Sequence, residues 1–238
     1  MIVISNDDGD SFGSRALLKA AKKLDSAYAI VPNRQRSAVS RALTLHKPLR
    51  VHDEGDGLYT LNGTPADCIV FSLFSGEFEK PDLVLSGINW GNNCGLGPMI
   101  GSGTIGACWL SVLEGVPSIA FSLQRKGHDW KKRENWGNEQ ELIDTVLRVV
   151  KELKPKLGPD KFFNVNLPEQ PFGAEMVYTN ELQRKNYRTV VEKRHDPNNV
   201  PYFWTSGIHT PPQKGTDLHE VVVNNRIVIS EISLWVNK

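Results

Sequence analysis

Residues 2–9 read Ile2-Val-Ile-Ser-Asn-Asp-Asp-Gly9, a short apolar run followed by an acidic turn. From Ser14 to Leu24 the apolar residues recur at helical spacing, and a second apolar run, 27–31, ends at Pro32. The long connection between the two runs favours parallel strands joined by a crossover helix. The stretch therefore predicts a βαβ unit with an acidic turn at the carboxyl end of its first strand.

The alternation of strands and helices continues to about residue 168. Thr64-Pro65 is typical of a helix start, and 82–86 and 117–123 are apolar runs of the kind found in strands buried on both faces. An amphipathic helix is predicted at 138–154. We therefore expect an α/β fold with a doubly wound, mainly parallel, Rossmann-like sheet. Further expected elements are strands at 44–51, 58–61 and 162–166, a Gly/Asn-rich loop at 87–101, a helix at 103–114, and a charged excursion at 124–137.

Beyond Pro168 polar segments are separated by Pro, Asn and Gly, so we expect a catalytic core at 1–168 and a C-terminal extension at 169–238. Two runs, 188–193 and 202–206, flank Asp196-Pro-Asn-Asn199 and predict a long projecting β-hairpin. An isolated hairpin is only marginally stable in water, so this arm is expected to pack on another subunit. The last segment has two interpretations: a tight hairpin at 221–229, or a helix at 217–223 followed by a strand at 226–236.

Composition argues against several classes of partner. The 28 basic and 27 acidic residues give a net charge of +1, which offers no broad positive field for a nucleic-acid polymer. No apolar run is long enough to suggest a membrane span. The three cysteines have no CxxC spacing and no secretory segment is recognised, so a reducing, cytoplasmic setting is expected. Small ligands fit this composition better than polymers or lipid.

The acidic turn is the first candidate site, because ligands of open α/β sheets bind beyond the carboxyl ends of the strands. Asp7 and Asp8 are adjacent carboxylates that repel one another unless a cation neutralises them. Hard oxygen ligands of this kind suit magnesium, manganese or calcium. The alternative is that one of the two aspartates merely caps the following helix.

The loop at 87–101 is the second candidate, because its glycines allow backbone N–H groups to turn toward an anion. Ser102-Gly103-Thr104 then begins a helix whose N-terminal amides favour phosphate. Asn89 offers a neutral oxygen to a metal. The alternative is a long flexible loop; taken together, the two candidates predict a metal beside a phosphate.

Two other motifs suggest different enzymes. Residues 101–106 fit GxGxxG, and Arg125 is a possible partner for the 2′-phosphate of NADP, but the motif does not follow directly on a strand, as the dinucleotide fingerprint requires. Asp8-Gly-Asp10 has the spacing of a haloacid-dehalogenase-type phosphatase, with Asp8 as nucleophile and Asp10 as acid/base. A nucleotide-sensing module without turnover is the non-enzymatic alternative.

The ordered set of motifs resembles the SurE survival-protein family of 5′/3′-nucleotidases. The matching segments are Ile4-Ser-Asn-Asp-Asp-Gly9, Val31-Pro-Asn-Arg-Gln-Arg-Ser37, Leu43-Thr-Leu45, Asn62-Gly-Thr-Pro-Ala-Asp-Cys68, Pro81-Asp-Leu-Val-Leu-Ser-Gly-Ile-Asn89, and Ser102-Gly-Thr104 running on to Glu114-Gly-Val-Pro-Ser-Ile-Ala120. The resemblance implies hydrolysis of nucleoside 5′- or 3′-monophosphates, and of short polyphosphate, with one divalent ion, Mg²⁺ or Mn²⁺, per subunit.

The resemblance also implies roles for individual residues. The implied metal ligands are Asp7, Asp8, Ser37 and Asn89, and the implied phosphate-binding residues are Asn93, Ser102, Gly103 and Thr104. Catalysis is expected to use Asp7 or Asp8 to accept a proton from the attacking water.

The resemblance further favours helix then strand at the C-terminus, and exchange of the projecting arm in a homodimer or homotetramer. The sequence departs from the family pattern at Asp10, where a hydrophobic residue is usual, at Ala38, where glycine is frequent, and at Gly101, where Tyr or His is common.

Overall fold

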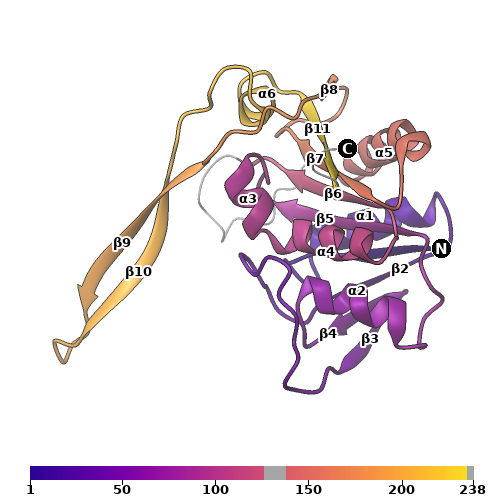
Figure 1. Ribbon diagram of the computed structural model, residues 1–238, viewed down its shortest axis with the longest axis horizontal. Helices are drawn as coiled ribbons and strands as arrows, with labels where there is room; N and C mark the ends of the chain where they lie inside the picture. The colour runs from indigo at the N-terminus through magenta and orange to yellow at the C-terminus, as the bar shows by residue number, and fades with distance from the viewer. Residues whose placement is uncertain (126–137, 235–238) are drawn as a thin grey trace.

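The computed structural model describes residues 1–125 and 138–234, and a nine-stranded sheet lies at its centre (Figure 1). Its strands are β1 (Ile2–Ser5), β2 (Ala27–Pro32), β3 (Val51–Gly55), β4 (Leu58–Leu61), β5 (Leu83–Trp90), β6 (Ser118–Leu123), β7 (Lys161–Leu167), β8 (Met176–Tyr178) and β11 (Ile227–Ser233). They are ordered β3-β4-β2-β1-β5-β6-β7-β11-β8. The six strands from β4 to β7 in this order are parallel, whereas β3 and β11 run antiparallel to β4 and β7. The expected doubly wound, mainly parallel sheet is confirmed.

Helices cover both faces of the sheet (Figure 1). The chain forms α1 (Phe12–Lys22), α2 (Pro65–Phe74), α3 (Leu96–Gly101), α4 (Gly103–Leu113), α5 (Glu139–Leu153), a 3₁₀ turn (Lys154–Lys156) and α6 (Asp217–Val222). Helices α1 and α5 pack together on one face and α2 and α4 on the other. Within the described ranges, no helix has the length and apolarity needed to cross a membrane.

The apolar run of β1 follows from this double cover. Successive side chains of a strand point to opposite faces, so both faces of β1 need apolar residues. Val3 belongs to the cluster that contains Ile69 of α2, whereas Ile4 belongs to the cluster that contains Leu17 of α1. Val3 and Ile4 are both fully buried. The first strand is therefore a central element of the core, and the turn after it is held on a rigid base.

Strand β5 is longer than the sequence predicts, because the expected loop at 87–101 begins with further strand residues and ends in α3. After a shift in register, Asn89 pairs with Ser122 and Trp90 with Leu123 of β6. Gly87 permits this continuation: a Cβ there would lie 2.2 Å from the carbonyl oxygen of Phe121. A glycine that resembles a loop residue is thus a point of close strand approach.

The prediction of a strand at 44–51 is wrong, because strand structure begins only at Val51. The preceding segment is fastened to the start of α2 by side chains instead of by a ladder. Thr44 donates through its backbone N–H and its hydroxyl to the two carboxylate oxygens of Asp67, at 2.9 and 2.6 Å. Most of the charged excursion expected at 124–137 lies outside the described residues, which omit 126–137.

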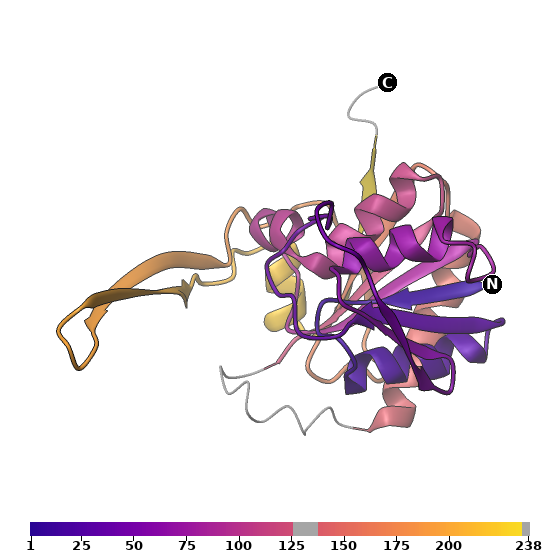
Figure 2. The ribbon, with the colours of Figure 1, turned by 90° about the horizontal axis from the view of Figure 1, so that it is seen from below.

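The projecting hairpin is confirmed. Strands β9 (Tyr187–His195) and β10 (Pro201–His209) form a separate two-stranded antiparallel sheet that extends away from the body (Figure 2). Its side chains include exposed Val191, Phe203 and Trp204. At the C-terminus, α6 followed by β11 confirms the helix-then-strand interpretation, and the tight hairpin at 221–229 is wrong. Strand β11 lies in the predicted C-terminal extension, 169–238, but joins β7 in the main sheet. The division of the chain into a catalytic core and an extension at residue 168 stays a prediction.

Candidate active site

The loops after β1 and β5 emerge side by side, because the two strands are parallel neighbours with Ser5 opposite Ser86. The acidic turn of the first loop lines a cavity of about 570 Å³ with both Asp7 and Asp8. The two aspartates are only 4% and 9% exposed. Two carboxylates thus share one largely buried wall.

Neither aspartate caps the following helix. The N-cap of α1 is Ser11, which forms a reciprocal capping box with Ser14 through hydrogen bonds of 3.0 and 3.3 Å. The end of α1 is therefore satisfied without help from Asp7 or Asp8. The helix-cap interpretation of the acidic turn is wrong.

Asp7 is held by the start of α4. Gly103 N–H donates to Asp7 Oδ2 at 3.0 Å, and the Thr104 hydroxyl donates to Asp7 Oδ1 at 2.6 Å. The pKa of Asp7 is raised to about 6, because burial, and to a smaller extent the neighbouring Asp8, outweigh the hydrogen bond from Thr104, which lowers the pKa. A buried carboxylate of this kind gains from a cation that takes the place of the proton.

Asp8 is held from two other loops. Trp90 N–H, at the end of β5, donates to Asp8 Oδ2 at 2.9 Å. The Gln35 side-chain amide lies 3.4 Å from Asp8 Oδ1 and 2.9 Å from the hydroxyl of Ser37. Gln35 therefore connects Asp8 to Ser37, and the loop after β2 is brought to the same cavity.

Asn89 completes a set of oxygen ligands that fits a hard divalent cation. Its side-chain amide donates to the Gly91 carbonyl at 2.8 Å, so that nitrogen is occupied and Oδ1 is the group that remains to bind a ligand. Asp7, Asp8, Ser37 and Asn89 all line the one cavity. In the part of the chain that the structure describes, no three His, Cys, Asp or Glu side chains cluster as a metal site. Two neutral oxygens beside two carboxylates are a donor set typical of magnesium or manganese.

The residues expected to bind phosphate fall into two groups. Asn93 and Ser102 line the cavity, whereas Gly103 and Thr104 do not, and contact Asp7 instead.

Asn93 is rigidly placed. Its backbone N–H donates to Asn166 at 2.7 Å, its carbonyl accepts from Asn164 at 3.0 Å, and its side chain donates to Ser122 at 2.8 Å. The polar ends of β6 and β7 thus fix one wall of the cavity.

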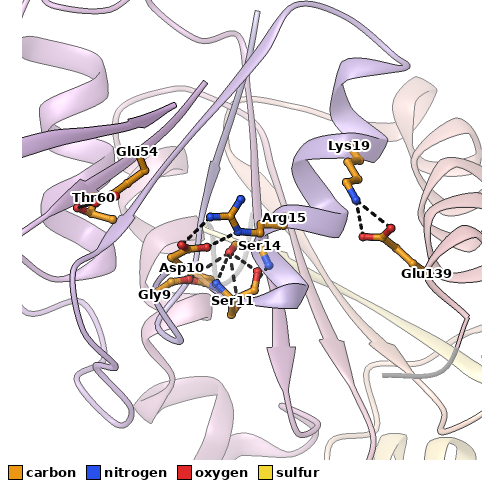
Figure 3. A network of polar contacts seen from close by, with 10 residues as sticks. Gly9, Asp10, Ser11, Ser14, Arg15, Lys19, Glu54, Thr60 and Glu139 are labelled. Carbon is orange, nitrogen blue, oxygen red and sulfur yellow. Dashed lines mark hydrogen bonds and ion pairs between the residues drawn. The ribbon is translucent and has the colours of Figure 1, made fainter. Parts of the chain in front are cut away.

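Asp10 lies outside the cavity. Its carboxylate receives hydrogen bonds of 2.7 and 2.8 Å from the guanidinium of Arg15, on the exposed side of α1 (Figure 3). A second ion pair, Lys19 with Glu139, joins α1 to α5 in the same view (Figure 3). Asp10 is therefore not placed to serve Asp8 as an acid/base, and the haloacid-dehalogenase-type alternative loses its second carboxylate.

The GxGxxG motif has a structural explanation. Gly101 ends α3, and Gly106 lies in α4, where a Cβ would be 2.2 Å from the carbonyl oxygen of Ser40. Arg125 lies with its guanidinium carbon 4.7 Å from the ring centroid of Trp90. These residues pack the loops around the cavity and do not form the tight strand-to-helix turn of a dinucleotide site.

Several residues that line the cavity were not predicted from the sequence. Gln35 and Trp90 adjoin predicted site residues, so proximity along the chain was the available signal. Lys185, Asn186, Tyr187 and Thr189 also line the cavity, although they lie far along the chain at the base of the arm. No local pattern marks this second group, because long-range hydrogen bonds bring it to the site.

Comparison with known proteins places these features in a family context. Residues 2–189 match the family model described as Survival protein SurE. The 5′-nucleotidase SurE of Methanothermobacter thermautotrophicus is 38% identical over 217 residues, which cover 87% of this chain and 82% of the relative. The 5′-nucleotidase SurE of Methanocella arvoryzae is 36% identical over 244 residues, covering 98% and 91%. The crystal structure of a SurE protein from Aquifex aeolicus superposes with a TM-score of 0.79 at 30% identity, covering 100% and 94%.

Proposed function

Since the chain belongs to the SurE survival-protein family, we propose that it is a metal-dependent nucleotidase that hydrolyses nucleoside monophosphates to nucleoside and phosphate. Its relatives named as 5′-nucleotidases support an enzyme that acts on phosphoric monoesters. The observation that carries the proposal is the convergence of Asp7, Asp8, Ser37 and Asn89 on one cavity that Asn93 and Ser102 also line.

The metal ligands of this proposal are Asp7, Asp8, Ser37 and Asn89, with one Mg²⁺ or Mn²⁺ per subunit. When bound, the ion supplies a Lewis acid for the phosphoryl oxygens and lowers the pKa of a coordinated water. Hydrogen bonds from Gly103, Thr104 and Trp90 hold the two carboxylates in place for this purpose. Such support matters because ligands that must reorient bind metal weakly.

The remaining chemistry belongs to the protein's own side chains. Asp7 or Asp8 accepts the proton of the attacking water, since these are the carboxylates of the cavity wall. Asn93 and Ser102 bind the phosphate, and the N-terminal end of α4 adds a favourable dipole. Gly103 and Thr104 serve phosphate binding indirectly, by orienting Asp7.

The substrate range of the proposal includes 5′- and 3′-monophosphates and short polyphosphate, because an ion and a phosphate-binding wall recognise the terminal phosphoryl group that these share. The hairpin arm is the segment proposed to join subunits into a homodimer or homotetramer, which would cover its exposed apolar side chains. The buried free thiols of Cys68, Cys94 and Cys108 suit the cytoplasmic location expected from the sequence.

The test is phosphate release from AMP under Mg²⁺, Mn²⁺ and chelator, together with calorimetric titration of Mn²⁺. Asp8→Ala and Asn89→Ala are each expected to abolish both metal-stimulated release and the tight binding of Mn²⁺. Full turnover in both variants would overturn the assignment of the site. Nucleotide binding without any release of phosphate by the wild type would favour a sensing module instead.

A further inference from the structure

The base of the hairpin arm forms part of the cavity wall. Tyr187, the first residue of β9, lines the same cavity as the two aspartates, and so do Lys185 and Asn186 immediately before it. A substrate whose phosphate lies beside Asp7 and Asp8 must place the rest of its structure against other walls of this cavity. The arm is therefore a candidate for recognition of the nucleoside.

A buried carboxylate fastens this segment to the active-site loop. Asp217 is fully buried and accepts three backbone hydrogen bonds, from Gly95 at 2.5 Å, Gln183 at 2.9 Å and Leu218 at 2.8 Å. Gly95 belongs to the loop after β5, and Gln183 lies just before the arm. One side chain thus links the loop that follows Asn93 to the segment that precedes Tyr187.

Further hydrogen bonds fix the same junction. Leu96 N–H donates to the Gln183 carbonyl at 2.9 Å, and the side-chain amide of Asn186 donates to the Cys94 carbonyl at 2.5 Å. Gln183 and Asn186 are only 2% and 3% exposed. Extensive buried hydrogen bonding rigidifies a segment. Within the described residues, Asn186 Oδ1 is the one side-chain polar atom of Gln183, Asn186 and Asp217 without a partner. The wall that contains Tyr187 is therefore fixed against the active-site loop.

The ring of Tyr187 is placed by its neighbours across the hairpin. It pairs with His209 in the ladder, and the two ring centroids are 4.5 Å apart. A Cβ on Gly207 would lie 3.0 Å from Cβ and 3.1 Å from Cδ1 of Tyr187, so the glycine leaves room for the ring. Tyr187 nevertheless stays 41% exposed. The ring of Tyr187 is thus held in place by its neighbours and is still accessible to a ligand.

Trp90 is the other aromatic residue among the described residues that line the cavity, but it has a different role. The guanidinium of Arg125 covers its ring at 4.7 Å, and it packs against the hydrophobic core of the α1 and α5 face. Its backbone N–H holds Asp8. Trp90 is thus engaged in building the site, which leaves Tyr187 as the better-placed aromatic surface for a ligand.

We propose that Tyr187 determines specificity in the nucleotidase reaction by stacking on the nucleobase of the substrate. This proposal rests on the proposed function, because it assigns the non-phosphate part of the same substrate. Stacking on an aromatic side chain tolerates every base, since each base has a π-face. The site therefore selects substrates that carry a base over those that lack one, and binds the larger purines more tightly than pyrimidines.

The test compares AMP with ribose 5-phosphate, which carries the same phosphoryl group without a base. Because stacking on an aromatic ring is a sizeable share of base binding, Tyr187→Ala is expected to lower kcat/KM for AMP about 10-fold, mostly through KM, and to change that for ribose 5-phosphate less than about twofold. Tyr187→Phe keeps the ring and is expected to retain wild-type values on both substrates. Tyr178→Ala, which removes an exposed tyrosine that does not line the cavity, is the matched control.

Equal losses on AMP and ribose 5-phosphate, or no loss on either, would overturn the proposal. If the wild type hydrolyses neither AMP nor ribose 5-phosphate, the nucleotidase assignment itself is wrong. In that case calorimetric AMP binding decides on Tyr187: a Kd that rises about 10-fold in Tyr187→Ala supports the base contact, and an unchanged Kd refutes it.

Discussion

Thr104 does not line the cavity, yet its hydroxyl donates a 2.6 Å hydrogen bond to Asp7 Oδ1. The side chain of Thr104 therefore acts on the site through the carboxylate of Asp7. Gly103 N–H reinforces this at the other oxygen of Asp7. The two hydrogen bonds set the direction in which Asp7 presents its remaining lone pairs to a cation.

Thr104→Val is expected to weaken Mn²⁺ binding and AMP hydrolysis by about 10- to 100-fold, because the loss of a partner that orients a metal ligand has effects of this size. Valine keeps the volume but removes the donor. Thr104→Ser keeps the hydroxyl and serves as the control, with activity near that of the wild type. Calorimetric titration of Mn²⁺ and steady-state kinetics measure both effects, and an active, tightly binding Thr104→Val would contradict the orienting role.

The raised pKa of Asp7 predicts that pH affects the stability of the metal-free protein. Because the pKa is about 6 in the folded protein, above that of an unfolded aspartate, the folded protein binds this proton more tightly. The resulting stabilisation is complete at acidic pH and is lost as pH rises through about 6. Asp7→Asn is therefore expected to raise the free energy of unfolding at pH 8 by roughly 1–3 kcal/mol while abolishing activity.

Urea denaturation at pH 5 and pH 8 checks this expectation, with Mn²⁺ as the second variable. The ion is expected to stabilise the wild type at pH 8 and to leave Asp7→Asn unchanged, since the variant lacks the carboxylate. A metal-free wild type whose stability increases from pH 5 to pH 8, by an amount that Asp7→Asn abolishes, would refute a raised pKa for Asp7.

Removal of the third carboxylate near the acidic turn is expected to spare activity. Asp10→Asn breaks only the exposed ion pair with Arg15, so stability should fall by less than about 1 kcal/mol and kcat/KM for AMP should stay within about twofold of the wild type. Acid quenching with labelled substrate should trap no aspartyl-phosphate. A loss of turnover in Asp10→Asn comparable to that in Asp8→Ala would revive the nucleophilic mechanism.

Lys185 supplies a positive charge to the described lining of the cavity, and among residues 1–125 and 138–234 its ammonium has no carboxylate partner. Lys185→Gln is expected to raise KM for AMP by about fivefold, because an exposed charge attracts an anion by roughly 1 kcal/mol at close range. The effect should shrink at high salt. Arg184→Gln is the control, because it removes a positive charge from the adjacent residue, which does not line this cavity. Equal effects of the two variants on KM would show that Lys185 acts only through the net charge of the protein.

Two glycines of the GxGxxG motif should respond differently to alanine. Gly106→Ala places a methyl group 2.2 Å from the Ser40 carbonyl oxygen, so urea denaturation should show a loss of about 1–3 kcal/mol. At Gly101 no heavy atom lies within 4 Å of the added Cβ, so Gly101→Ala should be nearly neutral. Similar stabilities for the two variants would argue against the close approach of Ser40 to α4.

The alternation of strands and helices was predictable because it depends on local apolar patterns, as in residues 2–5 and 138–154. The strand predicted at 82–86 ends before Gly87, whereas β5 continues to Trp90. A glycine in the sequence does not reveal whether it ends a strand or lets two strands approach closely. The capping role of Ser11 was likewise hidden, because Asp7 and Asp8 satisfy the same local rule. These errors come from residues whose meaning depends on a neighbouring strand or helix.

The candidate ligands could be named from the sequence, Asp7 and Asp8 from their position after a strand and Ser37 from the resemblance alone. Their shared role as metal ligands stays a prediction. The wall around Tyr187 could not be foreseen, because it depends on the hydrogen bond of Asp217 with Gly95, which spans 122 positions along the chain. No local pattern encodes such a contact.

The same contact has a consequence for biosynthesis. The acidic turn and the loop that contains Asn89 and Asn93 are synthesised before Asp217, because they precede it along the chain. Asp217, which links Gly95 to Gln183 by hydrogen bonds, is made 122 positions after Gly95. A nascent chain that has already folded around the acidic turn would thus hold the residues proposed to bind phosphate before the wall proposed to bind the nucleoside is fixed, and selective turnover would begin only once Asp217 has been made.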